Sequence, residues 1–180
     1  MESSVQDRLI ERITFAEGQA EIWRVFEDAD LFRAVVEALS EPWKPSRPTK
    51  VAGVEARGFI LGAAVAHVLG TGFVAVRKEG SLFAGAKVAT TAKRDYQGRE
   101  HRLRLRRESL TRADRVVLVD DWCQTGHQAQ AAARLIRSSS AEFLGLSVIV
   151  DQAGPEIANA FPRYLGLVQA EELKGGSLSS

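Results

Sequence analysis

The chain has 180 residues, of which 45% are hydrophobic and 26% charged, and its formal net charge is +1. These values are ordinary for a globular protein and exclude an intrinsically disordered chain, a collagen-like repeat and a generally basic nucleic-acid arm. The charge is uneven, because residues 93–115 hold nine basic and four acidic residues.

The first predicted element is a helix at residues 30–39, where apolar side chains recur at helical spacing. Either Asp28 or Asp30 is expected to be its N-cap, because a short carboxylate accepts hydrogen bonds from the free amides of the first turn. The following segment, residues 41–50, contains three prolines and is predicted to be a connector without a helix.

Strands and helices alternate through the rest of the chain. The expected elements are strands at 50–55, 72–76, 115–120 and 143–150, and helices at 59–69 and 128–137. Continuous apolar strands between helices predict an α/β fold with an open, mainly parallel, Rossmann-like β-sheet flanked by helices. Ligands of such folds bind in the turns that follow the carboxyl ends of the strands.

One domain is expected over residues 1–174, with a disordered tail at 175–180. Cys123 is the single cysteine, which excludes an internal disulfide and fits a reducing compartment. The start has no signal pattern, and the longest apolar run, residues 58–69, is shorter than the roughly 20 residues that span a bilayer. We therefore expect a cytoplasmic protein without a membrane partner.

The most informative turn follows the strand at 115–120. This strand ends in two adjacent carboxylates, Asp120 and Asp121, and Thr125 and Gly126 then open a helix. Amides at a helix start can hold a phosphate, and paired carboxylates can accept hydrogen bonds from vicinal hydroxyls or hold a metal through water. The pattern predicts a sugar-phosphate clamp; the alternative is an ordinary strand-to-helix turn with Asp as the N-cap.

With this turn, the chain resembles the type I phosphoribosyltransferases, whose signature is an apolar strand, two acids, three variable residues and Thr-Gly-Gly-Thr or Ser. Residues 51–62 are similar to the pyrophosphate-loop segment of the adenine enzymes of that family, and residues 76–80 to their next strand end. Asp95 and Tyr96 resemble the Glu-Tyr pair of their mobile catalytic loop. The resemblance covers residues 28–151.

The resemblance implies a magnesium-dependent transfer of the 5-phosphoribosyl group from phosphoribosyl pyrophosphate (PRPP) to a purine-like base, with release of pyrophosphate. Adenine is the first candidate acceptor, which implies a role in purine salvage and nucleotide metabolism. The family fold adds a mobile β-hairpin loop, and family members are commonly homodimers. A PRPP-binding regulator with lost or weak transferase activity is the alternative function.

The resemblance also implies roles for particular residues. The catalytic residues would be Asp95, Tyr96 and Arg57. The PRPP-binding residues would be Asp120, Asp121, Gln124, Thr125, Gly126, His127, Gln128, Ala129, Arg77 and Lys78. The pyrophosphate loop would consist of Glu55, Ala56, Arg57 and Gly58. Magnesium would arrive with PRPP, with Asp120 and Asp121 as candidate ligands.

The sequence departs from the family at the phosphate loop and the base pocket. Thr-Gly-Gly-Thr has become Thr125-Gly-His-Gln128, which keeps the backbone amides; His127 could add a charge when protonated or face solvent. Trp122 and Trp23 could stack on the base, a contact worth about 1–3 kcal/mol, or belong to the core.

The excess of basic residues has two parts. Residues 93–99 fall in the predicted mobile loop, where positive charge would attract an anionic donor. Arg102, Arg104 and Arg106 alternate with leucines, which predicts a strand with arginines on one face. That face is either a solvated surface or a dimer or nucleic-acid surface, and a nucleic-acid partner is not expected.

Overall fold

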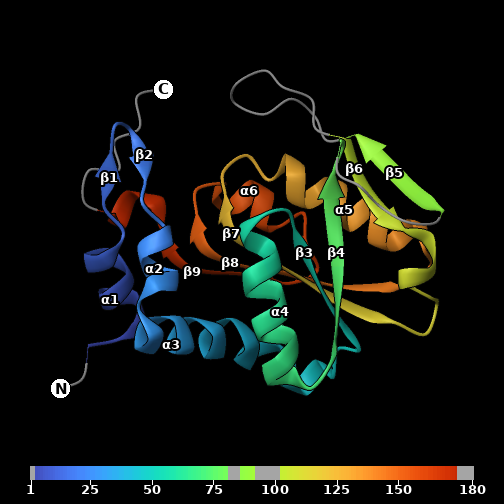
Figure 1. Cartoon of the computed structure of the whole chain (residues 1–180), viewed down its shortest axis with the longest axis horizontal. Helices are drawn as coiled ribbons and strands as arrows, with labels where there is room; N and C mark the ends of the chain where they lie inside the picture. Colours follow the sequence, from blue (N-terminus) through green and yellow to red (C-terminus); the bar gives the residue numbers. More distant parts are fainter. Residues whose placement is uncertain (1–2, 81–85, 92–101, 174–180) are drawn as a thin grey trace.

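The main sheet has a parallel centre and an antiparallel edge (Figure 1). A computed structural model describes residues 3–80, 86–91 and 102–173. The strands of this sheet are β3 (Lys50–Val54), β4 (Gly72–Lys78), β5 (Lys87–Thr91), β6 (Arg102–Arg106), β7 (Arg115–Cys123), β8 (Glu142–Asp151) and β9 (Tyr164–Gln169). Their order is β5-β6-β4-β3-β7-β8-β9. Strands β4, β3, β7, β8 and β9 pair in parallel, whereas β6 pairs antiparallel with β4 and β5.

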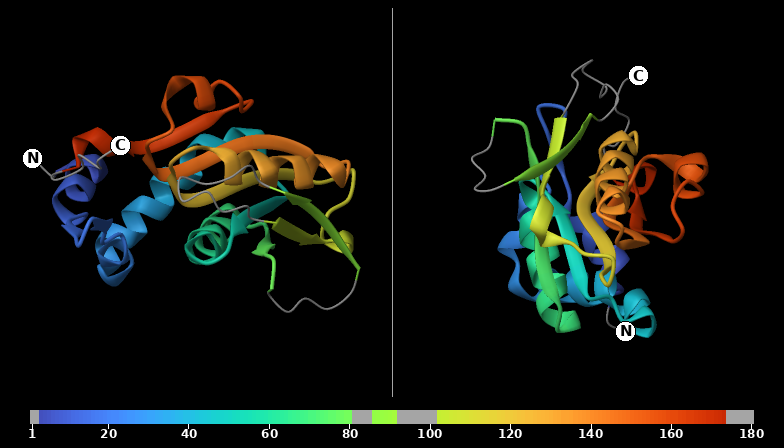
Figure 2. Two further views of the ribbon diagram at one scale, coloured as in Figure 1. Left: turned by 90° about the horizontal axis from the view of Figure 1, so that it is seen from above. Right: turned by 90° about the vertical axis from the view of Figure 1, so that its right-hand side faces the viewer.

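Helices cover both faces of the sheet (Figure 2). The α-helices are α1 (Val5–Arg12), α2 (Trp23–Glu27), α3 (Ala29–Ser40), α4 (Arg57–Leu69), α5 (His127–Ser138) and α6 (Gly154–Ala158). Short 3-10 helices lie at η1 (Glu41–Ser46), η2 (Arg107–Ser109) and η3 (Ala170–Glu172), and β1 (Phe15–Ala16) pairs with β2 (Gln19–Ala20) in a separate hairpin. The expected α/β fold, a mainly parallel sheet flanked by helices, is thus confirmed.

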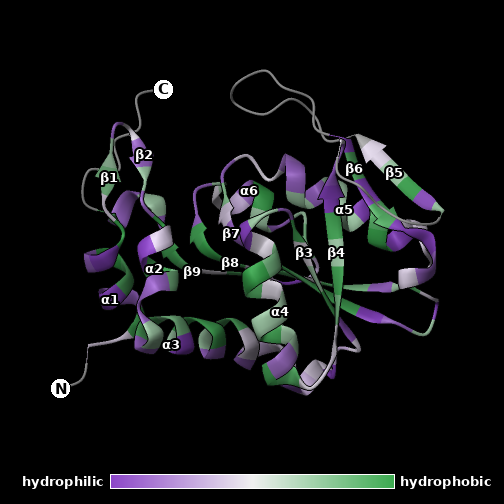
Figure 3. Cartoon of the chain, in the orientation of Figure 1, coloured by the Kyte–Doolittle hydropathy of each residue, from purple (hydrophilic) through white to green (hydrophobic). Residues whose placement is uncertain are grey.

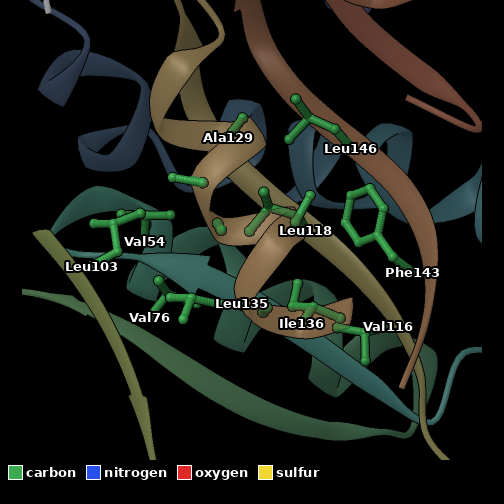
Figure 4. Close-up of a cluster of buried hydrophobic side chains, with 14 of the residues drawn as sticks. Val54, Val76, Leu103, Val116, Leu118, Ala129, Leu135, Ile136, Phe143 and Leu146 are labelled. Carbon is green, nitrogen blue, oxygen red and sulfur yellow. The ribbon is translucent and has the colours of Figure 1, made fainter. Parts of the chain in front are cut away.

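Strand β7 divides the core between these two faces. Val116 and Leu118 join the cluster under α5, which Figure 4 shows, whereas Val117 and Val119 join the cluster under α1 to α4. Successive side chains of a strand point to opposite faces, so an unbroken apolar run fits a strand that is covered on both sides. β7 therefore holds its carboxyl end in a fixed position between two packed layers.

Helix α4 is hydrophobic along most of its length (Figure 3). Its inner residues Leu61, Val65 and Ala66 are buried against the sheet, while Ile60 and Val68 are exposed. The helix ends at Gly70, whose positive φ of 64° suits a glycine after the last turn. Among the described helices, none is long and apolar enough to cross a membrane.

The predicted elements agree with the structure to within three residues at each end. Asp28 is the N-cap of α3, because its carboxylate accepts a hydrogen bond from Leu31 N at 3.0 Å. β7 continues three residues beyond the predicted end at Asp120, so the two acids lie inside the strand. The elements before residue 28 had no prediction, since they are only two to eight residues long.

The prediction that the proline-rich connector contains no helix was wrong, because residues 41–46 form η1. Pro42 lies in the first turn, where no amide donor is needed, and a 3-10 turn also accommodates Pro45. The turn inserts Trp43 into the core, where its indole N–H donates a 2.6 Å hydrogen bond to Ser147 Oγ of β8. η1 therefore fastens the connector to the sheet.

Replacing Trp43 by Phe is expected to lower the free energy of unfolding by about 1–3 kcal/mol, because the change removes a buried hydrogen bond and part of a buried ring. Trp23→Phe is the matched control. Because Trp23 is 49% exposed, this variant should lose only about 0.5 kcal/mol of the free energy of unfolding. Urea denaturation of both variants measures the difference. Equal destabilisation would contradict the assignment of Trp43 as a core anchor.

The arginines of β6 share one face of the strand, as the alternation predicts, and Leu103 and Leu105 are buried on the other. Arg104 forms an ion pair with Glu79, and Arg102 lies 3.5 Å from the same carboxylate. This pairing offsets part of the local positive charge and fits the reading of the face as a solvated surface.

Candidate active site

The polar residues that were predicted to follow or end β3, β4 and β7 lie at one edge of the sheet. Strands β4, β3, β7 and β8 are neighbours, and their parallel direction brings their carboxyl ends to the same edge. The residues that follow β3 and those at the ends of β4 and β7 are therefore adjacent in space although up to 70 positions apart in sequence. This is the edge at which open α/β sheets bind their ligands.

Asp120 and Asp121, called the acid pair below, are each only 6% exposed. Asp120 Oδ1 accepts a 3.0 Å hydrogen bond from Asp121 N, and Asp120 Oδ2 accepts one of 3.3 Å from Gln128 Nε2. Burial raises the pKa of Asp120 well above the usual carboxyl value, and the negative charge of Asp121 raises it further. The fold thus holds Asp120 where burial and the neighbouring carboxylate both disfavour its negative charge.

Arg57 approaches the acid pair from the first turn of α4. Its Nε lies 2.7 Å from Asp121 Oδ2, which is enclosed by protein and accepts no hydrogen bond of normal geometry from the described residues. The contact is therefore a close charge attraction rather than a well-directed hydrogen bond. The Arg57 guanidinium also lies 5.9 Å from the centre of the Trp23 ring, which links α2 to the acid pair.

Two glycines let α4 begin this close to β7. A methyl group on Gly58 would lie 2.9 Å from Asp120 Oδ1, and one on Gly53 would overlap the carbonyl of Gly58. The turn between β3 and α4 also contains a cis peptide bond between Glu55 and Ala56. Because Gly53 and Gly58 carry no Cβ, the start of α4 and the acid pair can come into contact.

The turn after β7 leads into the start of α5. Gly126 precedes the helix with a φ of 68°, and its carbonyl accepts the first helical hydrogen bond from Gln130 N at 2.8 Å. A methyl group at Gly126 would overlap Ile157 Cγ2 of α6. The free amides of the first turn and the positive end of the helix dipole face the turn, an arrangement suited to an anion.

The other predicted phosphate residues lie around this helix start. Gln124 and Thr125 are half-buried in the turn, His127 and Gln128 are half-buried in the first turn of α5, and Ala129 is buried. The Gln128 side chain reaches the acid pair, with its Nε2 3.3 Å from Asp120 Oδ2. The altered Thr-Gly-His-Gln sequence thus still builds a helix start led by a glycine.

Glu55 holds the end of β4 next to the turn that follows β3. Its carboxylate accepts a 3.1 Å hydrogen bond from Arg77 Nη2 and one of 3.0 Å from Lys78 N. Arg77 is half-buried and lies in an ion pair with Glu55, which fixes its position at the sheet edge. Arg57, Arg77 and Lys78 thus lie at the same edge of the sheet as the acid pair, where Glu55 offsets the charge of Arg77.

Cys123, the last residue of β7, is buried, and burial raises the pKa of its thiol to about 11. A thiol with so high a pKa is almost wholly protonated at neutral pH and is a poor nucleophile. Its role is therefore packing.

Two of the predicted residues, Asp95 and Tyr96, lie outside the described residues. The two tryptophans that were candidates for stacking on the base differ in exposure. Trp122 is half-buried, and its indole N–H donates a 2.8 Å hydrogen bond to Gln152 Oε1. Trp23 is 49% exposed, so the reading of Trp23 as a core residue was wrong.

Two polar residues at the end of β8 had no prediction. Asp151 is buried and accepts hydrogen bonds from the Tyr164 hydroxyl at 2.7 Å and from Ala153 N at 2.9 Å, and Gln152 follows it. The pattern that identified the acid pair, polar residues directly after an apolar strand, is also present here, because Asp151 and Gln152 follow the apolar run at 143–150.

The described residues contain no group of three or more His, Cys, Asp and Glu side chains that could hold a metal ion on its own. Two buried carboxylates do fit Mg²⁺, which is commonly held by one or two carboxylates together with substrate phosphates and water. The donor set therefore suits a magnesium ion that arrives with a phosphorylated ligand.

A family model described as "phosphoribosyl transferase domain" matches residues 28–166. The adenine phosphoribosyltransferase of Maricaulis maris is 39% identical over 135 residues, which are 74% of this chain and 73% of that protein. The protein of the same name from Brucella suis is 42% identical over 125 residues, 69% of this chain and 67% of its own length.

The chain is also similar to solved structures of adenine phosphoribosyltransferases. The crystal structure of adenine phosphoribosyltransferase from Rhodothermus marinus superposes with a TM-score of 0.83 at 30% identity, covering 92% of this chain and 98% of its own. The enzyme from Giardia lamblia, solved in complex with 9-deazaadenine, has a TM-score of 0.83 at 26% identity and covers 93% of this chain and 98% of its own.

Proposed function

This chain belongs to the phosphoribosyltransferase family, and on that premise we propose that it transfers the 5-phosphoribosyl group of PRPP to adenine and releases pyrophosphate. The observation that carries the proposal is the acid pair beside the glycine-led start of α5. One part of this arrangement suits sugar hydroxyls and the other a phosphate group, and the distance between them along the chain is only five residues.

PRPP would bind along the carboxyl edge of the sheet. The amides around Thr125 to Ala129 would hold the 5′-phosphate, and the acid pair would accept hydrogen bonds from the two ribose hydroxyls. The pyrophosphate group would face the turn of residues 55–58 and the positive charges of Arg57, Arg77 and Lys78. The 5′-phosphate and the ribose would thus lie at the end of β7, and the pyrophosphate at the ends of its neighbours β3 and β4.

The reaction breaks the bond between ribose C1 and the pyrophosphate oxygen, whose electron pair leaves with pyrophosphate. The attacking base nitrogen loses its proton to the departing pyrophosphate, and its electron pair forms the new bond to C1. Positive charge develops on the sugar in the transition state, and the buried acid pair would stabilise it from a fixed position. Arg57 would exchange its contact with Asp121 for the departing pyrophosphate, while the ribose hydroxyls take over that carboxylate.

Magnesium, when bound, would neutralise pyrophosphate oxygens and so stabilise the leaving group. Asp120 and Asp121 would hold it, directly or through water. Asp95 and Tyr96 would belong to a loop that closes over the donor, as the family resemblance implies. Trp23, exposed beside Arg57, and Trp122, half-buried next to the acid pair, are the candidate stacking partners of the base.

We further infer that the protein acts as a cytoplasmic homodimer in purine salvage. The exposed Ile60 and Val68 on α4 lie on the same helix as Arg57, so a dimer surface there would adjoin the pyrophosphate side of the site.

Pyrophosphate release from magnesium-PRPP, measured with a panel of purines, pyrimidines and related heterocycles, tests the proposed function. We expect release to depend on magnesium and to be fastest with adenine. Tight PRPP binding without release for any base would favour the alternative of a PRPP-binding regulator. If the protein bound no PRPP, both functions would be wrong.

A further inference from the structure

The turn after β8 brings a polar side chain to the sheet edge that carries the acid pair. Gln152 is the first residue after β8, and Trp122 directly follows Asp121 in β7. The two strands are neighbours in register, with Trp122 opposite Val150. Gln152 therefore lies at the same edge of the sheet as the acid pair, one strand further along.

The backbone on both sides of the Gln152 side chain is held in place. Gln152 N donates a 2.9 Å hydrogen bond to the carbonyl of Cys123, which ties the turn after β8 to the end of β7. Ala153 N donates to Asp151 Oδ1 at 2.9 Å, and the buried Asp151 also accepts the Tyr164 hydroxyl at 2.7 Å. The side chain thus projects from a fixed turn.

Trp122 sets the direction of the Gln152 amide. Its indole Nε1, which can only donate, forms a 2.8 Å hydrogen bond to Gln152 Oε1. This bond assigns the carbonyl oxygen to the side facing Trp122 and turns the NH₂ group the other way. Both side chains are half-buried, and the pair offers an oriented hydrogen-bond donor at the sheet edge that carries the acid pair, one strand away from it.

We propose that Gln152 is a specificity-determining residue, whose Nε2 donates a hydrogen bond to a ring nitrogen of the transferred purine. The inference rests on the proposed function, in which the acid pair holds the sugar to which that base becomes attached. An oriented donor accepts a base with a lone pair at this position and rejects one with a C–H group there. The donor would then be left without a partner, which is the strongest form of discrimination available to a hydrogen-bonding site.

The test measures dissociation constants by calorimetry for AMP and its 1-deaza, 3-deaza and 7-deaza analogues, each of which replaces one ring nitrogen by C–H. Wild-type protein should bind one of the three at least about tenfold more weakly than AMP. Gln152→Leu should bind AMP as weakly as that analogue and should no longer distinguish the two. Gln152→Glu still accepts from Trp122 but has no donor when ionised, so it should show the same loss.

Ribose 5-phosphate, which has no base, is the control ligand, and its affinity should stay within twofold in both variants. Trp122→Phe keeps an aromatic ring but frees the amide, and should lose part of the discrimination. Equal discrimination by wild type and Gln152→Leu, or none by wild type, would overturn the inference.

Turnover of adenine with PRPP is measured separately, so the two proposals can fail independently. Discrimination without turnover would contradict the proposed function and leave the role of Gln152 intact. Turnover without discrimination would support the proposed function and contradict the role of Gln152. A wild-type protein that bound no AMP would contradict both proposals.

Discussion

Asp120→Asn is expected to lower kcat/KM for PRPP by about 100-fold while raising the free energy of unfolding by about 1 kcal/mol. The activity falls because a buried carboxylate that would accept ribose hydroxyls and stabilise a cationic transition state becomes a neutral amide. The stability rises because burial and Asp121 both disfavour the charge that the substitution removes. Asparagine has the same size, so the close contact with Gly58 is preserved.

Asp28→Asn is the matched control for this prediction. Asp28 is the half-buried N-cap of α3, and asparagine caps a helix about as well as aspartate does, so activity should be unchanged and the free energy of unfolding should change by no more than about 0.5 kcal/mol. Initial rates of pyrophosphate release and urea denaturation of metal-free protein give the two quantities. An Asp120→Asn enzyme with kcat/KM within threefold of wild type would remove the acid pair from the proposed mechanism.

Gly126→Ala is expected to lower the free energy of unfolding by about 3 kcal/mol and to weaken PRPP binding at least tenfold. An alanine with φ near 68° is strained by about 1 kcal/mol, and its methyl group would overlap Ile157 Cγ2. The resulting shift displaces the first turn of α5, whose amides are the proposed phosphate donors. Urea denaturation and calorimetric titration with PRPP measure the two effects.

Two further variants separate backbone strain from the steric overlap. Gly154 has a similar φ of 75° and no atom within 4 Å of the position of an added methyl group, so Gly154→Ala should lose only about 1 kcal/mol. Adding Ile157→Ala to Gly126→Ala removes the atom that the methyl group meets and should restore part of the PRPP affinity. If Gly126→Ala and Gly154→Ala were equally mild, the tight packing of α6 against the α5 start would be disproved.

The sequence allowed the sheet and its functional edge to be predicted because the signals involved are local. An apolar run such as residues 116–119 indicates a buried strand, and the two acids that follow mark its end. Since parallel strands present their carboxyl ends at one edge, the residues after β3 and those at the ends of β4 and β7 could be expected to meet there. The structure confirms that they do; their roles toward PRPP stay predictions.

Contacts between distant residues could not be predicted in the same way. Trp23, Arg57 and Asp121 are up to 98 positions apart, and nothing in their local sequence indicates that Arg57 lies against both Trp23 and Asp121. Likewise the proline-rich segment at 41–46 lacks any helical pattern, and the hydrogen-bond partner of the buried Trp43, Ser147, lies 104 positions away. Such contacts depend on how packed layers fit together rather than on the pattern of any one segment.

The pairing of β3 with β7 has a consequence for how the chain reaches its native state. This central pair joins residues 50–53 to residues 116–119, so 62 residues must be enclosed in a loop before the middle of the sheet exists. Contacts that close long loops form late, because the chain gives up much conformational freedom before they are made. During synthesis the acid pair therefore meets Arg57 only after β7 has left the ribosome, so the sheet edge that carries the candidate site cannot be complete before then.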